Sequence, residues 1–163
     1  MAMETLKDLY VEQLRDLYSA ENQILKALPK LEKAASHDEL KMAFKEHRVV
    51  TEKQVERLDQ IFEMLGEKSS GHHCKGMEGL LKEGDEMMRE TGDEDTLDAG
   101  LIAAAQRVEH YEIAGYGTVR TYARRLGLND QAQLLDQTLK EEGETDHRLS
   151  RLSESIINPD AQK

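Results

Sequence analysis

The sequence has little of what β-sheet proteins and disulfide-bonded proteins need. It contains one cysteine, two prolines and no tryptophan, and aromatic residues make up 4% of the chain. A lone cysteine, Cys74, excludes an internal disulfide framework, and so few aromatic residues disfavour a β-sandwich or barrel. No run approaches the ~20 apolar residues of a membrane span, and the charged N-terminus lacks the apolar segment of a signal peptide. We therefore expect a soluble, cytoplasmic protein with no membrane partner.

Acidic residues outnumber basic ones, 33 to 22, for a formal net charge of −11. A surface of this sign repels phosphates, so we expect no nucleic acid among the partners. The length of 163 residues is that of one domain. Strong helix formers such as Leu, Ala, Glu and Lys dominate the composition, which favours an all-α fold.

Apolar residues recur at steps of three and four along four long segments, which is the pattern of a helix face buried in a bundle. We predict helices over about residues 5–35, 39–65, 96–126 and 131–157. The connections after the first and third helices are short, so each pair forms an antiparallel hairpin. Between the pairs lies a crossover of about residues 66–95 with a short helix near 77–90. We predict a single domain over residues 1–163, a ferritin-like four-helix bundle with a fifth helix in its crossover.

Local signals define several helix ends. Thr5 with Asp8 has the spacing of a capping box, Asp38 is a candidate N-cap for the second helix, and Gly127 is the expected C-terminal glycine of the third. Pro29 should kink or interrupt the first helix. Asn158-Pro159 should stop the fourth helix and leave about residues 158–163 frayed.

Polar side chains occupy core positions on all four long helices. Glu21, His47, Glu112 and Glu142 each lie on an apolar stripe. Glu112 and Glu142 are equally far from the predicted turn near residue 127, and His47 lies within about one turn of the level of Glu21. Since a lone buried carboxylate is costly to desolvate, it normally stays neutral, pairs with a base or binds a metal.

Carboxylates from several helices, joined by an imidazole, are suited to iron or manganese. Glu109 lies one turn before Glu112 and is a candidate second ligand or hydrogen-bond acceptor. Three alternatives stay open at this point: the glutamates are rim residues, they pair with a base such as Arg15 or Arg107, or His47 is an ordinary core histidine. A further metal candidate is the cluster His72-His73-Cys74, whose imidazoles and thiolate suit zinc or copper.

At these residues the sequence resembles the YciE/YciF family of bacterial ferritin-like stress proteins. The resemblance covers nearly the whole chain, including CKGMEGLLKEG in the crossover. The other matching blocks surround the four core polar residues; they are LYSAENQILKALPKL, FKEHRVVTEKQVERL, DAGLIAAAQRVEHYEIAGYGT and LLDQTLKEEGETD. It implies a ferritin-like bundle, usually a homodimer, linked to stress responses. By analogy with ferritins and rubrerythrins it also implies a di-iron carboxylate site.

Helix two departs from the family pattern. Family members commonly carry acids where this chain has Val49 and Val50, and the stripe predicts that Val50 lies opposite Glu21. The sequence therefore leaves open a two-metal site, a one-metal site and a site that no longer binds metal. Two hypotheses follow. The first is a protein that binds iron or manganese, with oxidation of Fe(II) by oxygen or peroxide. The second is a non-enzymatic dimeric stress or scaffold protein.

Overall fold

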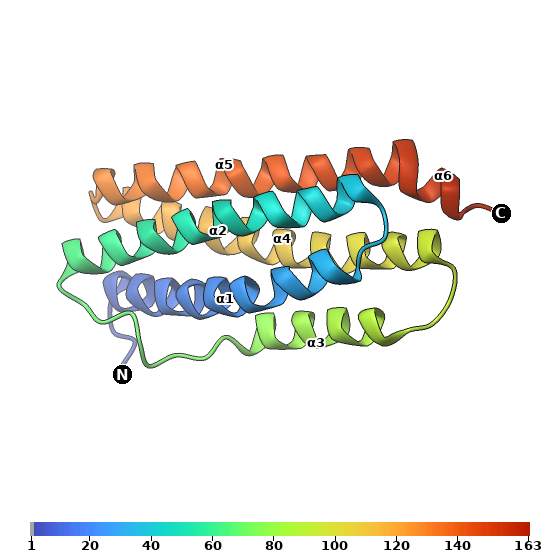
Figure 1. Cartoon of the computed structure of the whole chain (residues 1–163). Helices are drawn as coiled ribbons and strands as arrows, with labels where there is room; N and C mark the ends of the chain where they lie inside the picture. The colour runs from blue at the N-terminus through green and yellow to red at the C-terminus, as the bar shows by residue number, and fades with distance from the viewer. Residues whose placement is uncertain (1) are drawn as a thin grey trace.

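The computed structural model describes residues 2–163, and within them the secondary structure is entirely helical (Figure 1). The elements are α1 (Leu6–Ala34), α2 (Asp38–Leu65), α3 (Lys75–Arg89), α4 (Glu94–Arg125), α5 (Asn129–Leu152), a π-helical turn (Ser153–Ile157) and α6 (Asn158–Ala161). The predicted all-α fold is confirmed.

The four long helices lie side by side as two antiparallel hairpins, α1 with α2 and α4 with α5 (Figure 1). The hairpins meet where α1 packs on α4 and α2 packs on α5. The crossover runs back along the outside of the bundle, and its helix α3 packs against α1 and α4. This is the predicted ferritin-like four-helix bundle.

Most helix ends follow the local signals in the sequence. Thr5 and Asp8 form a reciprocal capping box, and Gly127 has the positive φ of 73° that ends α4. At α2 the N-cap is His37, whose side chain accepts from Glu39 N, so the prediction of Asp38 was wrong by one residue. Pro29 does not interrupt α1, which runs on to Ala34.

The C-terminal segment differs from the prediction of a frayed tail. After α5 the chain widens into a π-helical turn and continues through Asn158–Ala161 as α6, which packs against α4. Pro159 lies in the first turn of α6, directly after the π-helical turn. Lys163 also forms ion pairs with Asp93 and Asp95.

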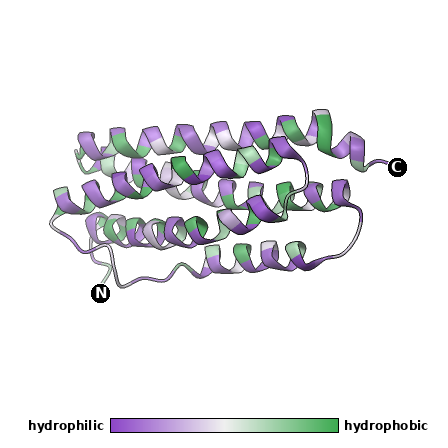
Figure 2. Ribbon diagram, viewed as in Figure 1, coloured by the Kyte–Doolittle hydropathy of each residue, from purple (hydrophilic) through white to green (hydrophobic). Residues whose placement is uncertain are grey.

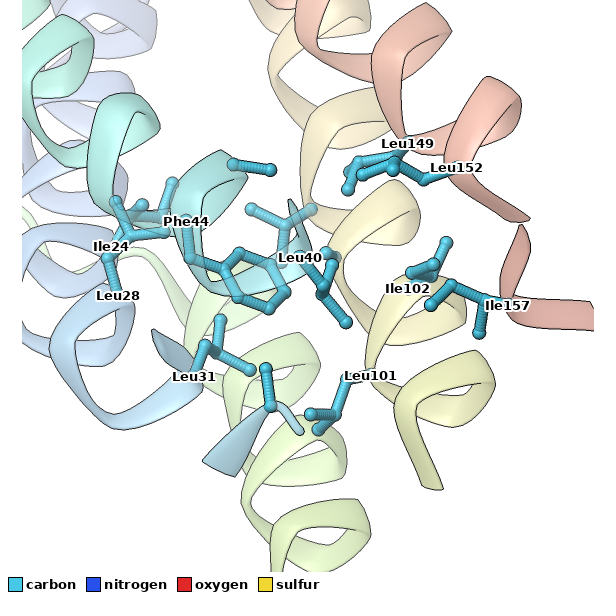
Figure 3. Packing of buried hydrophobic residues seen from close by; sticks show 14 of the residues in the cluster. Ile24, Leu28, Leu31, Leu40, Phe44, Leu101, Ile102, Leu149, Leu152 and Ile157 are labelled. Atoms are coloured by element: carbon cyan, nitrogen blue, oxygen red, sulfur yellow. The ribbon is translucent and has the colours of Figure 1, made fainter. Parts of the chain in front are cut away.

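Apolar side chains fill the bundle as two separate clusters. The Phe44 cluster (Figure 3) includes Ile24, Leu28, Leu40, Phe44, Ile102, Leu149 and Ile157. The Leu14 cluster includes Tyr10, Leu14, Leu58, Ile61, Val119 and Leu135. Hydrophobic and hydrophilic residues alternate along every helix, as expected for amphipathic helices (Figure 2). None of the helices in residues 2–163 has the length and apolarity needed to cross a membrane.

Candidate metal centre

A polar layer separates the two apolar clusters. Each long helix passes from one cluster to the other and carries its buried polar residues in between: α1 carries Glu21, α2 carries His47, α4 carries Glu109 and Glu112, and α5 carries Glu142. Exposed fractions are 6% for His47 and at most 1% for the four glutamates. All five residues predicted from the sequence therefore point into the bundle.

The five side chains assemble into two groups that share one member. His47, Glu109 and Glu142 form one triad, and Glu21, Glu112 and Glu142 form the other. In each triad the three donor atoms lie within 4.8 Å of one another, which is close enough to surround a single ion. Within residues 2–163 no other set of three or more His, Cys, Asp or Glu side chains meets this criterion.

Most carboxylate oxygens of this layer have no hydrogen-bond partner among residues 2–163. Both carboxylate oxygens of Glu112 and of Glu142 are buried and unpartnered, as are one oxygen each of Glu21 and Glu109 and the Nε2 atom of His47. A buried polar atom without a partner costs about 1–3 kcal/mol, and more if it is charged. The alternative in which basic side chains neutralise Glu112 and Glu142 is thus wrong for the described residues.

Tyr116 makes the one strong hydrogen bond to the layer. Its hydroxyl donates to Glu21 Oε1 at 2.5 Å, and the ring is fully buried on α4. Burial raises the pKa of the Glu21 carboxyl to about 8; the charge of Glu142 adds to this, and the Tyr116 hydrogen bond opposes it. Burial also raises the pKa of Tyr116 well above 10, so the phenol stays protonated and acts as a donor.

The other members of the layer show the same effect of burial. Burial, followed by the charge of Glu142, raises the pKa values of Glu109 and Glu112 well above 4.5. Burial lowers the pKa of His47, and the charge of Glu142 opposes this. His47 Nδ1 lies 3.4 Å from Glu109 Oε1. Without a cation, Glu21, Glu109, Glu112 and His47 thus favour their neutral forms, since charged groups are poorly solvated in a low dielectric and like charges repel there.

Asp98 shows how this fold treats a structural carboxylate. It is 1% exposed, on the same helix as Glu109 and Glu112. Its two oxygens accept hydrogen bonds from the backbone N–H groups of Ser36 and His37, each at 2.8 Å, and so hold the α1–α2 connection. Asp98, the fifth residue of α4, was not predicted as a buried carboxylate, and nothing in the local sequence distinguishes it from an exposed one.

The contribution of α2 differs from the prediction. Thr51 is fully buried, whereas Val50 is only half-buried and Val49 is 50% exposed. Val50 therefore does not occupy the seam, where Thr51 takes its place, whereas the other predicted core residue of this stretch, His47, is buried as expected. The Thr51 hydroxyl donates to the backbone oxygen of His47, one turn earlier in α2. This hydrogen bond stays within the helix, so Thr51 offers no free donor to the polar layer.

A polar network beside the layer was also missed. Arg57 makes a bidentate ion pair with Glu141, at 2.7 and 2.6 Å, and bonds Thr138 at 3.0 Å. Gln54 donates to Glu141 Oε2 at 3.2 Å. This network fixes the α5 backbone next to Glu142. Gln54 is fully buried, and its amide on an otherwise largely apolar stripe of α2 was the available signal.

The cluster His72-His73-Cys74 does not assemble. His72 pairs with Glu12 and Asp16, at 2.6 and 2.9 Å, and His73 pairs with Glu78. Cys74 is buried, and its sulfur caps α3 by accepting from Met77 N. These contacts attach the crossover to α1 and begin α3, which is a structural role.

An antiparallel helical bundle with one long crossover and a buried carboxylate layer is the ferritin-like class. The chain matches, over residues 5–162, the family model described as "Domain of unknown function (DUF892)", and it belongs to that family. It is 44% identical to Protein YciF of Escherichia coli (strain K12) over 163 residues, which cover 99% of this chain and 98% of that protein. The resemblance to the YciE/YciF family is thereby confirmed.

Solved structures agree with this assignment. The crystal structure of the E. coli stress protein YciF superposes with a TM-score of 0.92 and covers 99% of this chain and 100% of that one. YcfI from Rhodopseudomonas palustris is 45% identical, has a TM-score of 0.88 and covers 91% of this chain and 94% of that one. A Xanthomonas campestris protein at 21% identity has a TM-score of 0.75 and covers 94% of each chain, which shows a shared fold alone.

Proposed function

We propose that this protein binds iron or manganese in the polar layer, as two ions that share Glu142. Glu21 and Glu112 complete the ligands of one ion, and His47 and Glu109 complete those of the other. The observation that carries the proposal is the set of unpartnered oxygens in the two triads. A bound cation supplies the partner that each of these atoms lacks, and it makes the ionised carboxylates favourable in the interior.

The donor set favours these metals over softer ones. Four carboxylates and one imidazole offer hard oxygen donors with a single nitrogen, as iron and manganese prefer, and thiolates are absent from both triads. A bound iron or manganese centre supplies redox chemistry, and we propose oxidation of Fe(II) by oxygen or peroxide as the reaction. The two apolar clusters hold the ligands in place and keep bulk water out.

By its relationship to the E. coli stress protein, we propose that this activity belongs to a stress response. A homodimer as the working form is proposed from the family resemblance alone. The second candidate is a non-enzymatic dimeric stress or scaffold protein. The raised pKa values of Glu109 and Glu112 favour it, because protonated carboxyls remain neutral in the core without any metal.

Metal analysis of protein purified without chelators separates the two candidates. The first predicts bound iron or manganese, and saturable uptake of Fe(II) in an anaerobic titration. Because a ligand of the native state stabilises it by about 2.7 kcal/mol at 100 times its dissociation constant, thermal unfolding should move up by several degrees. Metal-free protein whose unfolding temperature ignores added Fe(II) and Mn(II) contradicts the first candidate.

Two substitutions locate the site, and a third serves as a control. Glu21→Ala and Glu142→Ala should each lose metal while keeping the helical circular dichroism spectrum. Glu144→Ala changes a neighbouring exposed glutamate on α5 and should keep wild-type uptake. Equal loss of metal in all three variants would show that uptake depends on the total negative charge of the protein and not on these particular ligands.

Val50→Glu tests the missing acid of α2. The new carboxylate would lie one helical turn after His47, on the half-buried side of α2. If the centre is weakened by the absence of an acid there, metal affinity should rise. Unchanged affinity would mean that the five existing ligands already form the complete site.

A further inference from the structure

A surface cavity of about 390 Å³ lies between α2 and α5, beside the polar layer. Its walls come from α2, between Ala43 and Val50, and from α5, between Glu141 and Arg151. Its size is within the 300–1,000 Å³ range of small-ligand pockets. Cavities of about 480 and 460 Å³ elsewhere on the surface contain none of the five candidate ligands in their walls.

His47 is the side chain that the cavity and the polar layer share. Its Nε2 atom is buried and unpartnered, and the ring is 6% exposed. The imidazole of His47 therefore belongs to the first triad and also forms part of the cavity wall. Val50, one turn further along α2, lies in the same wall and is half-buried.

The cavity has the size to admit a hydrated cation. Six water molecules at about 30 Å³ each occupy roughly 180 Å³, about half of the available volume. Glu46, Glu141 and Glu144 line the walls together with Arg148 and Arg151. Arg148 pairs with Glu46, and Arg57 pairs with Glu141. Glu144 is exposed, and its carboxylate forms no ion pair within residues 2–163.

We propose that this cavity is the route by which a divalent cation enters and leaves the polar layer, with His47 at its inner end and Val50 setting its width. The inference rests on the proposed function, because it presupposes that the layer holds metal. A route has a definite kinetic signature. Narrowing it slows entry and exit by the same factor and leaves the dissociation constant unchanged, since the bound and free states are not altered.

Stopped-flow kinetics with Co²⁺ test the route. The visible absorbance of protein-bound Co²⁺ reports loading, and mixing loaded protein with excess EDTA reports release. Val50→Trp should slow both processes at least about fivefold, with the dissociation constant unchanged within about twofold. Val50→Ala, a change that favours helix formation, should accelerate both. This second variant keeps the test decisive if the tryptophan variant does not fold.

Val49→Trp is the matched control. It places the same side chain on the adjacent residue of α2, which is 50% exposed and lies outside the cavity wall. Its loading and release should equal those of the wild type. The route is wrong if both tryptophan variants load at the wild-type rate, or if Val50→Trp changes the dissociation constant as much as the loading rate. Wild-type protein that takes up no Co²⁺ would instead overturn the proposed function, and the route with it.

Discussion

Asp98 and Glu112 are both buried carboxylates on α4, and the protein surrounds them in opposite ways. Asp98 accepts two backbone hydrogen bonds at the connection between α1 and α2. Glu112 has no partner for either oxygen, and two further carboxylates from α1 and α5 face it. Desolvation penalises both side chains, but only for Asp98 does the protein itself supply the compensating donors.

This difference distinguishes a structural carboxylate from a candidate functional one on the same helix. A carboxylate whose partners are present stabilises the fold, whereas a group of unpartnered carboxylates destabilises it until a proton or a cation arrives. In this protein the unpartnered carboxylates, which lower the stability of the metal-free fold, lie in the polar layer between two apolar clusters. Sites of function are where such departures from stability are expected.

The largest expected effect is on the pH dependence of stability in chelator-treated protein. The Glu21 carboxyl loses its proton near pH 4.5 in the unfolded chain and near 8 in the folded one. Between these values the folded state binds more protons, so its stability falls as pH rises, by up to ~1.4 kcal/mol per pH unit for one such group. Denaturant titrations of wild type and Glu21→Gln should differ increasingly from pH 4.5 to 8. A difference independent of pH would contradict the account.

Replacing an unpartnered carboxylate by an apolar side chain should stabilise the metal-free protein. Glu112→Met keeps an unbranched side chain of similar length and removes the buried carboxyl. We expect the free energy of unfolding at pH 8 to rise by about 1–4 kcal/mol. Metal uptake should fall in the same variant. Destabilisation of the metal-free protein would show that Glu112 has a structural partner.

Replacing the partnered carboxylate should have the opposite sign. Asp98→Ala leaves the N–H groups of Ser36 and His37 without acceptors, and we expect a loss of about 1–3 kcal/mol. Metal uptake should be unchanged, because Asp98 belongs to neither triad. Urea unfolding of this variant beside Glu112→Met measures the comparison directly. If both substitutions changed the free energy of unfolding in the same direction, the distinction between Asp98 and Glu112 would be wrong.

The smallest effect is expected for Tyr116→Phe. This change removes the 2.5 Å hydrogen bond to Glu21 and should cost about 0.5–1.5 kcal/mol at pH 8. Because that hydrogen bond lowers the pKa of Glu21, its loss should shift the pH-dependent fall in stability to higher pH. The same denaturant titrations measure both quantities. An unchanged midpoint would mean that Tyr116 only fills space.

The fold was predictable because helical periodicity is a local property. Local sequence signals predicted the capping box at Thr5, the glycine after α4 and the two short connections. Helix phase was sufficient to place Glu21, Glu109, Glu112 and Glu142 inside, since three flanking apolar residues define a face.

Other features depended on contacts across the fold. Val50 was wrongly placed on the buried face of α2 because it is apolar and Thr51 is polar, while the packing of α2 buries the threonine. The partners of Asp98 are backbone groups more than 60 residues away in sequence, which no local pattern reveals. The helical C-terminus was not predicted because a proline such as Pro159 usually indicates the end of a helix, whereas here it lies in the first turn of α6.

The most direct test of the central claim is metal stoichiometry by equilibrium dialysis against Mn²⁺, with Glu142 as the shared ligand. The account predicts two ions per chain in the wild type. It predicts one in Glu21→Ala, where the triad of His47, Glu109 and Glu142 remains intact, and none in Glu142→Ala. A Glu142→Ala variant that binds as much Mn²⁺ as the wild type would contradict it.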